Sequence, residues 1–237
     1  MKKVIINEEF WELFPEAQIN FLVMKDIDNH IEEKDEAHFT ELLKDAAKEA
    51  DKFLTEESFS SNPVVAQWRD AFSKFKTKKG ARSSIEALLK RVNQQRKFFP
   101  INPLVDIYNS VSLKYGVPSG GEDVDKIEGH LYLGKANGGE SFFPLGAEND
   151  SPALPEELIY FDEVGAICRC LNWREAQRTM LTEETTNAIL VIEAINNEQA
   201  KRANLAIHEL KNLVDAYFKT NSTIYTLSKE TAEAEIG

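Results

Sequence analysis

Several features that define common classes of protein are scarce or missing in this 237-residue sequence. It has two cysteines, Cys168 and Cys170, too few for a disulfide framework, so both are expected to be small buried hydrophobic residues. No hydrophobic run is long enough to span a bilayer, and the N-terminus MKKVIINEEF is too short and too acidic for a signal peptide. The sequence therefore predicts a cytoplasmic protein with no membrane partner.

The sequence also lacks the common motifs for nucleotide binding, for nucleophilic catalysis and for metal binding. The sequence contains no GxGxxG or GxxxxGK[ST] loop, no GxSxG nucleophile elbow and no CxxC pair. Its four histidines are scattered along the chain. We therefore expect neither a metal nor a cofactor, and the residues alone identify no catalytic group.

Positive charge is scarce and unevenly placed. The formal net charge of −12 argues against a general nucleic-acid-binding protein and against DNA as a partner. One window reverses the sign: residues 74–97 carry a net charge of +8, which leaves −20 for the rest of the chain. Its loop part holds the candidate contacts to RNA phosphates, Lys76, Lys78, Lys79 and Arg82. A solvated basic loop is an equally good interpretation, because no aromatic residues alternate with the charges.

Hydrophobic periodicity predicts strands and helices along the whole chain. Short strands are expected at 3–7, 19–24, 130–134, 157–162, 166–171 and 188–195. Helices are expected at 35–54, from 63, from 84 to about 92 after a Ser83–Glu86 capping box, from 103, and at 198–218. We expect one α+β domain over residues 1–237, with an antiparallel sheet covered by helices. Within it, residues 1–100 form a mostly helical covering part, 101–195 the core, and 196–237 a C-terminal helix with a frayed acidic tail.

The stretch Ile101–Asp123 predicts a helix followed by a glycine-rich turn. Asn102 is a good N-cap because its side-chain oxygen can accept hydrogen bonds from first-turn amides, and Pro103 suits the first helical position. Apolar residues then recur at helical spacing up to Tyr115, and Gly116 is typical of a helix end.

A line of polar residues on this helix leads into the glycine-rich turn. The residues concerned are Asn102, Asp106, Asn109, Gly120, Gly121 and Glu122. Helical residues three or four apart share a face, and glycine lets the backbone approach a ligand closely. The stretch therefore predicts one wall of a binding pocket, although a buried helix with ordinary caps fits the pattern better.

Polar residues are also dense in a second stretch, 168–186. The candidates for binding are Arg169, Asn172, Arg174, Glu175 and Arg178. On an extended segment Asn172 and Arg174 share one face, and their groups bind carboxylate, ribose or phosphate. A structural salt-bridge network with Asp162, Glu163 and Glu175 uses the same residue types and is slightly favoured.

Three segments together resemble a known family: INPLVDIYNSVSLKYGVPSGGEDVDKIEG, the strand at 130–134, and TEETTNAILVIEAI. The chain resembles the editing domain of the bacterial phenylalanyl-tRNA synthetase beta subunit, in a free-standing version. In that family a similar helix leads into a Pro-x-His-x-Phe-Asp turn, and an α+β fold places helices against an antiparallel sheet. The resemblance covers roughly residues 84–195.

The resemblance implies a second-sieve editing site that hydrolyses an amino acid wrongly esterified to tRNA. Because an aminoacyl ester is labile, positioning a water and stabilising the developing oxyanion can suffice. Gly120 stands where the family has its histidine, and Glu175 is implied as the glutamate that recognises the amino-acid side chain. We expect tRNA or aminoacyl-tRNA as the partner, with ester hydrolysis but no aminoacylation. The alternative is a non-catalytic module that binds RNA, a free amino acid or a nucleoside.

Overall fold

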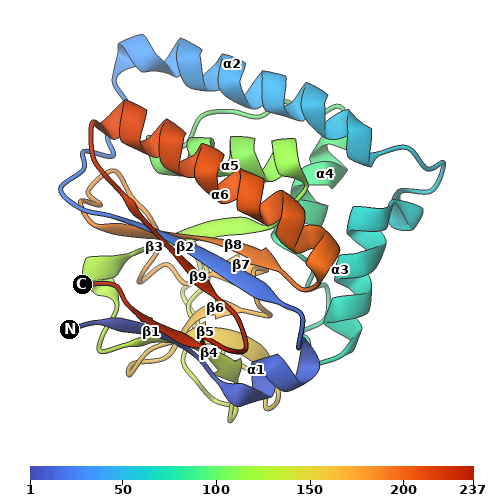
Figure 1. Ribbon diagram of the computed structural model, residues 1–237, viewed down its shortest axis with the longest axis vertical. Coiled ribbons are helices and arrows are strands. Elements are labelled where there is room, and N and C mark those ends of the chain that lie inside the picture. The colour runs from blue at the N-terminus through green and yellow to red at the C-terminus, as the bar shows by residue number, and fades with distance from the viewer.

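A computed structural model describes residues 1–237, in which a layer of helices, a four-stranded sheet and a six-stranded sheet are stacked (Figure 1). The helices are α1 (Glu8–Leu13), α2 (Glu33–Ala50), α3 (Pro63–Ser73), α4 (Ser84–Asn93), α5 (Pro103–Tyr115) and α6 (Asn197–Phe218). The strands are β1 (Lys3–Ile6), β2 (Gln18–Met24), β3 (Ser119–Asp123), β4 (Leu131–Lys135), β5 (Leu158–Phe161), β6 (Ala166–Arg169), β7 (Arg174–Glu175), β8 (Ala188–Ala194), β9 (Thr223–Leu227) and β10 (Glu233–Glu235). None of the helices is both long and apolar enough to cross a membrane.

The two sheets are almost entirely antiparallel. The six-stranded sheet has the order β10-β1-β4-β5-β6-β7, and the four-stranded sheet has the order β3-β8-β2-β9. Only β1 and β4 run parallel. The predicted α+β class with antiparallel sheet and covering helices is therefore confirmed. Strands β3 and β7 lie at the edges of their sheets, where only isolated bridges, such as that between Glu122 and Met180, continue the pairing.

The central strands β2 and β8 are buried on both faces, as their nearly continuous apolar sequences predict. Along β2, Ile19 and Phe21 face the six-stranded sheet, whereas Leu22 and Met24 face the helices. Successive side chains of a strand point to opposite faces, so one strand contributes to two cores. Helices α5 and α6 pack directly on this sheet, and α2 packs on α5.

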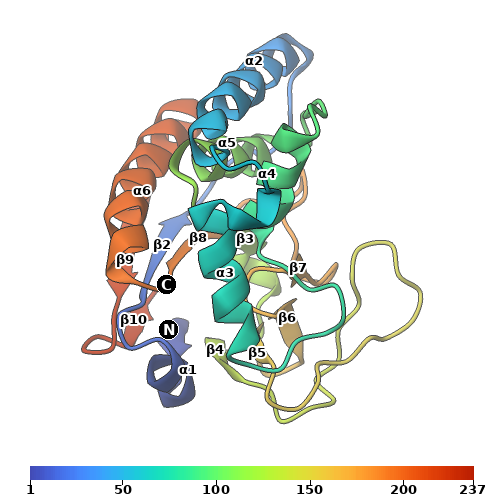
Figure 2. The ribbon, with the colours of Figure 1, turned by 90° about the vertical axis from the view of Figure 1, so that its right-hand side faces the viewer.

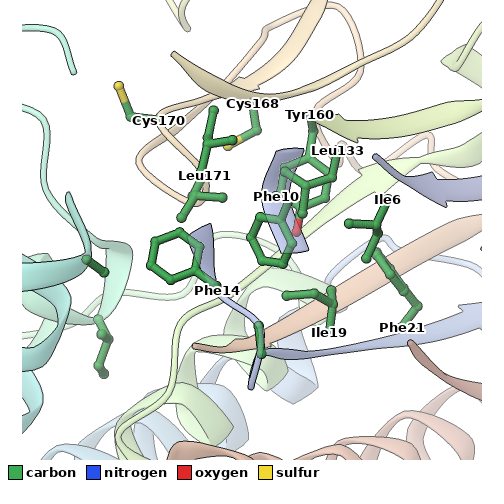
Figure 3. Close-up of a cluster of buried hydrophobic side chains, with 14 of the residues drawn as sticks. Ile6, Phe10, Phe14, Ile19, Phe21, Leu133, Tyr160, Cys168, Cys170 and Leu171 are labelled. Carbon is green, nitrogen blue, oxygen red and sulfur yellow. The ribbon is translucent and has the colours of Figure 1, made fainter. Parts of the chain in front are cut away.

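The core between the sheets is built from side chains of both sheets and α1 (Figure 3). Ile19 and Phe21 from β2 lie near Leu133 and Tyr160 from the six-stranded sheet, with Phe10 beside them. Phe10 is fully buried, and burial of such a side chain contributes about 2–3 kcal/mol. Both cysteines are free and buried in this core, as expected.

Local signals set the limits of α5. The Oδ1 atom of Asn102 accepts a hydrogen bond from the Val105 amide at 3.1 Å, and Pro103 occupies the first position. Gly116 ends the helix with a φ of 63°, the left-handed conformation that glycine adopts without strain. The helices predicted from 35, 63, 84, 103 and 198 are all confirmed within a few residues.

The start of α4 is correctly predicted, but its capping box is not formed. Ser83 donates to Oδ1 of Asn172 instead, and the same oxygen accepts from the Ser84 amide, both at 2.9 Å. Glu86 pairs with Arg69 at 2.7 Å. A residue distant in sequence therefore caps α4, and this fixes the helix against the turn that follows β6. Figure 2 shows α3 and α4 along the side of the sheets.

The acidic tail is not frayed, contrary to expectation, because Glu233–Glu235 forms β10 and pairs with β1. Lys3 contacts Glu233 at 2.9 Å, and the adjacent Ile236 is buried. Backbone pairing and one apolar anchor thus hold a segment whose composition suggested a loose end. The first 100 residues also supply the interior strands β1 and β2, so this part builds the sheets as well as covering them.

Candidate functional site

A cavity of about 580 Å³ lies between the sheets near the edge strands β3 and β7, a size typical of small-molecule sites. Side chains from α4, α5 and the loop at Pro144 and Leu145 complete its walls. Its polar lining consists of Ser84, Arg91, Tyr108, Asn109, Ser119, Glu122, Tyr160, Asn172, Arg174, Glu175 and Glu193. The cavity thus combines apolar walls with several converging charged groups.

The prediction of a glycine-rich turn at Ser119–Asp123 is wrong, because these residues form β3 and pair with β8 along the whole strand. Gly121 faces the helix-side core, where a Cβ atom would lie 2.4 Å from Cδ2 of Leu190. By alternation, the neighbouring positions Gly120 and Glu122 face the cavity. Pairing with a buried strand overrides the weak strand propensity of two glycines.

Gly120 leaves space that Glu175 occupies. A Cβ atom at position 120 would lie 3.1 Å from Oε1 of Glu175, so a side chain there would displace the carboxyl. The carboxyl of Glu175, on β7 of the six-stranded sheet, therefore lies beside β3, the edge strand of the four-stranded sheet. This contact brings together the two stretches that the sequence singled out separately.

Three glutamate carboxyls line the cavity, and burial raises the pKa of each. The pKa of Glu122 is well above its usual value because of burial and the neighbouring Glu175 carboxyl. Burial raises the pKa of Glu175 to about 7, although the Gly121 amide lowers it in part. Burial likewise raises the pKa of Glu193 to about 7. Near neutral pH these groups are poised to gain or lose protons.

Glu193 is held in a hydrogen-bonded network. Its Oε1 atom accepts from the Tyr160 hydroxyl at 2.7 Å, and its Oε2 atom accepts from the amide of Asn172. Asn172 in turn caps α4 through its side-chain oxygen. The network joins β8, β5 and α4 around the cavity and fixes the position of a carboxyl that is only 1% exposed.

Of the polar line on α5, only Asn109 lines the cavity. The Oδ1 atom of Asn102 accepts the capping hydrogen bond and a second hydrogen bond from the Asn29 side-chain amide at 3.1 Å. Asp106 accepts from the Ile101 amide at 3.0 Å, and burial raises its pKa to about 7. Asn102 and Asp106 therefore make ordinary contacts at the start of the helix, and neither residue lines the cavity.

The segment between β6 and β7 is a tight turn, so the expectation of an extended conformation is wrong. Cys170 and Leu171 have φ angles of 48° and 56°, in the left-handed region. The chain reverses there, which places Asn172 inside and Arg174 on the returning strand β7. Both residues line the cavity, together with the intervening Trp173.

The three predicted arginines separate into two roles. Arg169 is buried and pairs with Glu157 at 2.7 Å, and Arg178 pairs with Asp162 at 2.8 Å. The salt-bridge interpretation is correct for these two, although Arg169 uses a glutamate that the sequence did not single out. Arg174 lines the cavity instead, and its guanidinium lies 5.1 Å from the centre of the Trp173 ring.

The basic loop lies outside the cavity. Lys76, Lys78, Lys79 and Arg82 are all exposed, and Lys78 donates to the Ser151 hydroxyl. The loop connects α3 to α4, and α4 supplies a cavity wall. Phosphate contacts by this loop stay a prediction.

Sequence reasoning missed two charged residues of the cavity. Arg91, inside the basic window, lines the wall from α4, and its buried Nε atom has no acceptor. Glu193 could have been noticed as a lone carboxyl within the apolar run AILVIEAI, because such a group needs a partner when buried. Arg91 had no comparable signal among eight other basic residues of its window.

The chain is similar to known proteins in sequence and in fold. The family model described as "B3/4 domain" matches residues 67–222. A phenylalanine–tRNA ligase beta subunit from Cutibacterium acnes is 35% identical over 91 residues, which cover 38% of this chain and 11% of that protein. An N-terminal fragment of the phenylalanyl-tRNA synthetase beta subunit from Pyrococcus horikoshii matches with a TM-score of 0.52 at 13% identity, covering 99% of this chain and 54% of that chain.

The three similarities support different conclusions. At 13% identity the solved structure shows a shared fold. The chain spans about a tenth of the length of the curated relative. The resemblance drawn from the sequence motifs is confirmed by the family model and by the curated relative, and the solved structure confirms the shared fold.

Proposed function

Because the chain belongs to the B3/4 domain family, we propose that it binds the 3′ end of an aminoacyl-tRNA and hydrolyses a wrong aminoacyl ester in the cavity between its sheets. The observation that carries this proposal is the meeting of Gly120 and Glu175 across the cavity, since Gly120 lies in a segment that resembles the family and the same resemblance implies Glu175 as a site residue. Asn109, Glu122, Asn172 and Arg174 complete the proposed binding site.

The proposed reaction needs a positioned water and a group that accepts its proton. Glu175 lies half-buried beside Gly120, in the space where a side chain at that position would begin. Its pKa of about 7 suits a general base at neutral pH. The water oxygen adds to the ester carbonyl while Glu175 takes a proton. The ester C–O bond then breaks, and the ribose oxygen leaves with that proton.

Tests of the reaction use Glu175→Gln and a panel of aminoacyl-tRNAs that includes tyrosyl, phenylalanyl and lysyl esters. We expect ester loss above the buffer rate for at least one member, with a rate that rises with pH up to about 7. Loss of one catalytic group typically costs about a hundredfold or more in rate, and the remaining activity should lose that pH dependence. A Glu175→Gln variant with the wild-type rate and pH profile contradicts this role.

Binding of tRNA tests the basic loop separately. Changing Lys76, Lys78 and Lys79 together to glutamate should weaken binding, and wild-type affinity should fall steeply with salt. The matched control changes three exposed lysines elsewhere in the chain, Lys34, Lys44 and Lys48, and should have a smaller effect. Equal losses in the two triple variants would remove the loop from the proposal.

A non-catalytic binding module is the second candidate, favoured by the glycine at position 120 where the resembling family has an imidazole. Measurable tRNA binding without acceleration of any ester in the panel would select this candidate. Hydrolysis of any member above the buffer rate would reject it.

A further inference from the structure

We propose that the cavity selects an aminoacyl group whose side chain ends in a cation, an amine or a guanidinium, and holds that cation at Glu122. The inference rests on the proposed function and names the substrate class of the same site. The Oε2 atom of Glu122 is an unpartnered acceptor, since it is fully buried and receives no hydrogen bond of normal geometry. The Thr179 hydroxyl lies beside this carboxyl and lowers its pKa in part, but no hydrogen bond of normal geometry joins the two groups. A buried carboxyl oxygen without a donor is costly, and a bound donor removes that cost.

The lack of a paired cation distinguishes this carboxyl cluster from most other buried acids of the chain, and Asp106, which also has no cation, accepts from the Ile101 amide instead. Glu86 pairs with Arg69, Glu157 with Arg169, and Asp162 with Arg178. No lysine, arginine or histidine forms an ion pair with Glu122, Glu175 or Glu193. Arg91 and Arg174 line the same cavity but pair with none of these three carboxyls, so a bound cation would be their ion-pair partner and would favour their ionised forms.

The number of carboxyls argues for a cationic side chain in addition to an α-ammonium group. One carboxyl suffices for the α-ammonium that every aminoacyl ester carries. Glu193 already accepts two hydrogen bonds from the protein, whereas Glu122 has an oxygen to spare. The ring of Tyr108 also lines the cavity, and an aromatic face attracts a cation.

Two arginines line the same cavity and suit the anionic part of the ligand. The Nε atom of Arg91 is buried without an acceptor, and its Nη2 atom donates to the Lys97 carbonyl. Arg174 is exposed and lies against Trp173. An acidic interior with accessible guanidinium groups fits a ligand that has a cation at one end and a phosphate at the other.

A neutral aromatic side chain is a poor fit by the same reasoning. A phenyl ring at Glu122 would exclude water from the carboxyl without supplying a donor. A tyrosine hydroxyl supplies one donor but no charge. Because hydrogen bonds to charged groups are stronger than neutral ones, we expect a cationic side chain to bind at least tenfold more tightly than an uncharged one with the same carbon chain.

The experiment measures binding of stable 3′-aminoacylamino-3′-deoxyadenosine conjugates by calorimetry. The lysyl and norleucyl conjugates differ only in the terminal amine, and the tyrosyl conjugate provides an aromatic comparison. We expect the lysyl conjugate to bind at least tenfold more tightly than the other two. Glu122→Gln should abolish that preference, whereas the control Glu183→Gln, at an exposed position, should retain it. Thermal unfolding confirms that each variant is folded.

Free lysine methyl ester and norleucine methyl ester separate this inference from the proposed function. Equal binding of the lysyl and norleucyl conjugates overturns the inference and leaves the proposed function standing. Preference for the free lysine ester, with no binding of any adenosine conjugate, supports the inference and overturns the proposed function. A Glu122→Gln variant that keeps the preference overturns the assignment of Glu122, and absence of all binding overturns both proposals.

Discussion

Replacement of Glu193 by glutamine should stabilise the protein at alkaline pH and have little such effect in acid. Burial raises the pKa of this carboxyl from 4.5 to about 7. The folded state therefore holds a proton that the unfolded state releases, and stability falls as pH rises from about 4.5 to about 7. One pKa unit corresponds to about 1.4 kcal/mol, so the loss amounts to about 3 kcal/mol above pH 7.

Glutamine can keep the local hydrogen bonds of Glu193. Its oxygen accepts from the Asn172 amide, whose own oxygen is committed to Ser83 and Ser84. Its amide can donate to the Tyr160 oxygen, which reverses the direction of the present bond. The substitution therefore removes the ionisable group while leaving the network connected, and any constant difference between the proteins reflects this rearrangement.

Urea unfolding followed by tryptophan fluorescence measures the effect, since Trp11 and Trp68 are buried. The stability of Glu193→Gln minus that of the wild type should grow by about 3 kcal/mol between pH 5 and pH 8. Glu175 and Asp106 titrate in the same range but are present in both proteins, so their contributions cancel. A difference that stays constant from pH 5 to pH 8 refutes the reasoning.

Two further predictions concern groups that lie outside the cavity. Arg169→Met should destabilise the protein by about 3–5 kcal/mol in urea unfolding because it leaves Glu157 buried and unpaired, and adding Glu157→Gln should recover most of that loss; an additive double variant would contradict this. Asn102→Ala should cost about 1 kcal/mol by loss of the α5 cap, with ligand affinity of the folded protein unchanged; a larger loss of affinity than of stability would return Asn102 to the binding site.

Local sequence was sufficient for most of the helices and for the buried strands. The limits of α5 follow from Asn102, Pro103 and Gly116, since each acts on the backbone of its own helix end. Strand β2 could be predicted because burial on both faces requires a nearly continuous apolar run. The family resemblance was likewise readable, since its motifs are contiguous.

Tertiary structure alone decided the site. Ser119–Asp123 has the composition of a turn, and only pairing with β8 makes it a strand that points Gly120 and Glu122 into the cavity. Arg169, Arg174 and Arg178 are alike in sequence, yet two meet buried carboxyls and one lines the cavity. A charged side chain's role depends on which groups the fold places beside it, because desolvation and pairing, unlike helix caps, act between residues far apart in the chain.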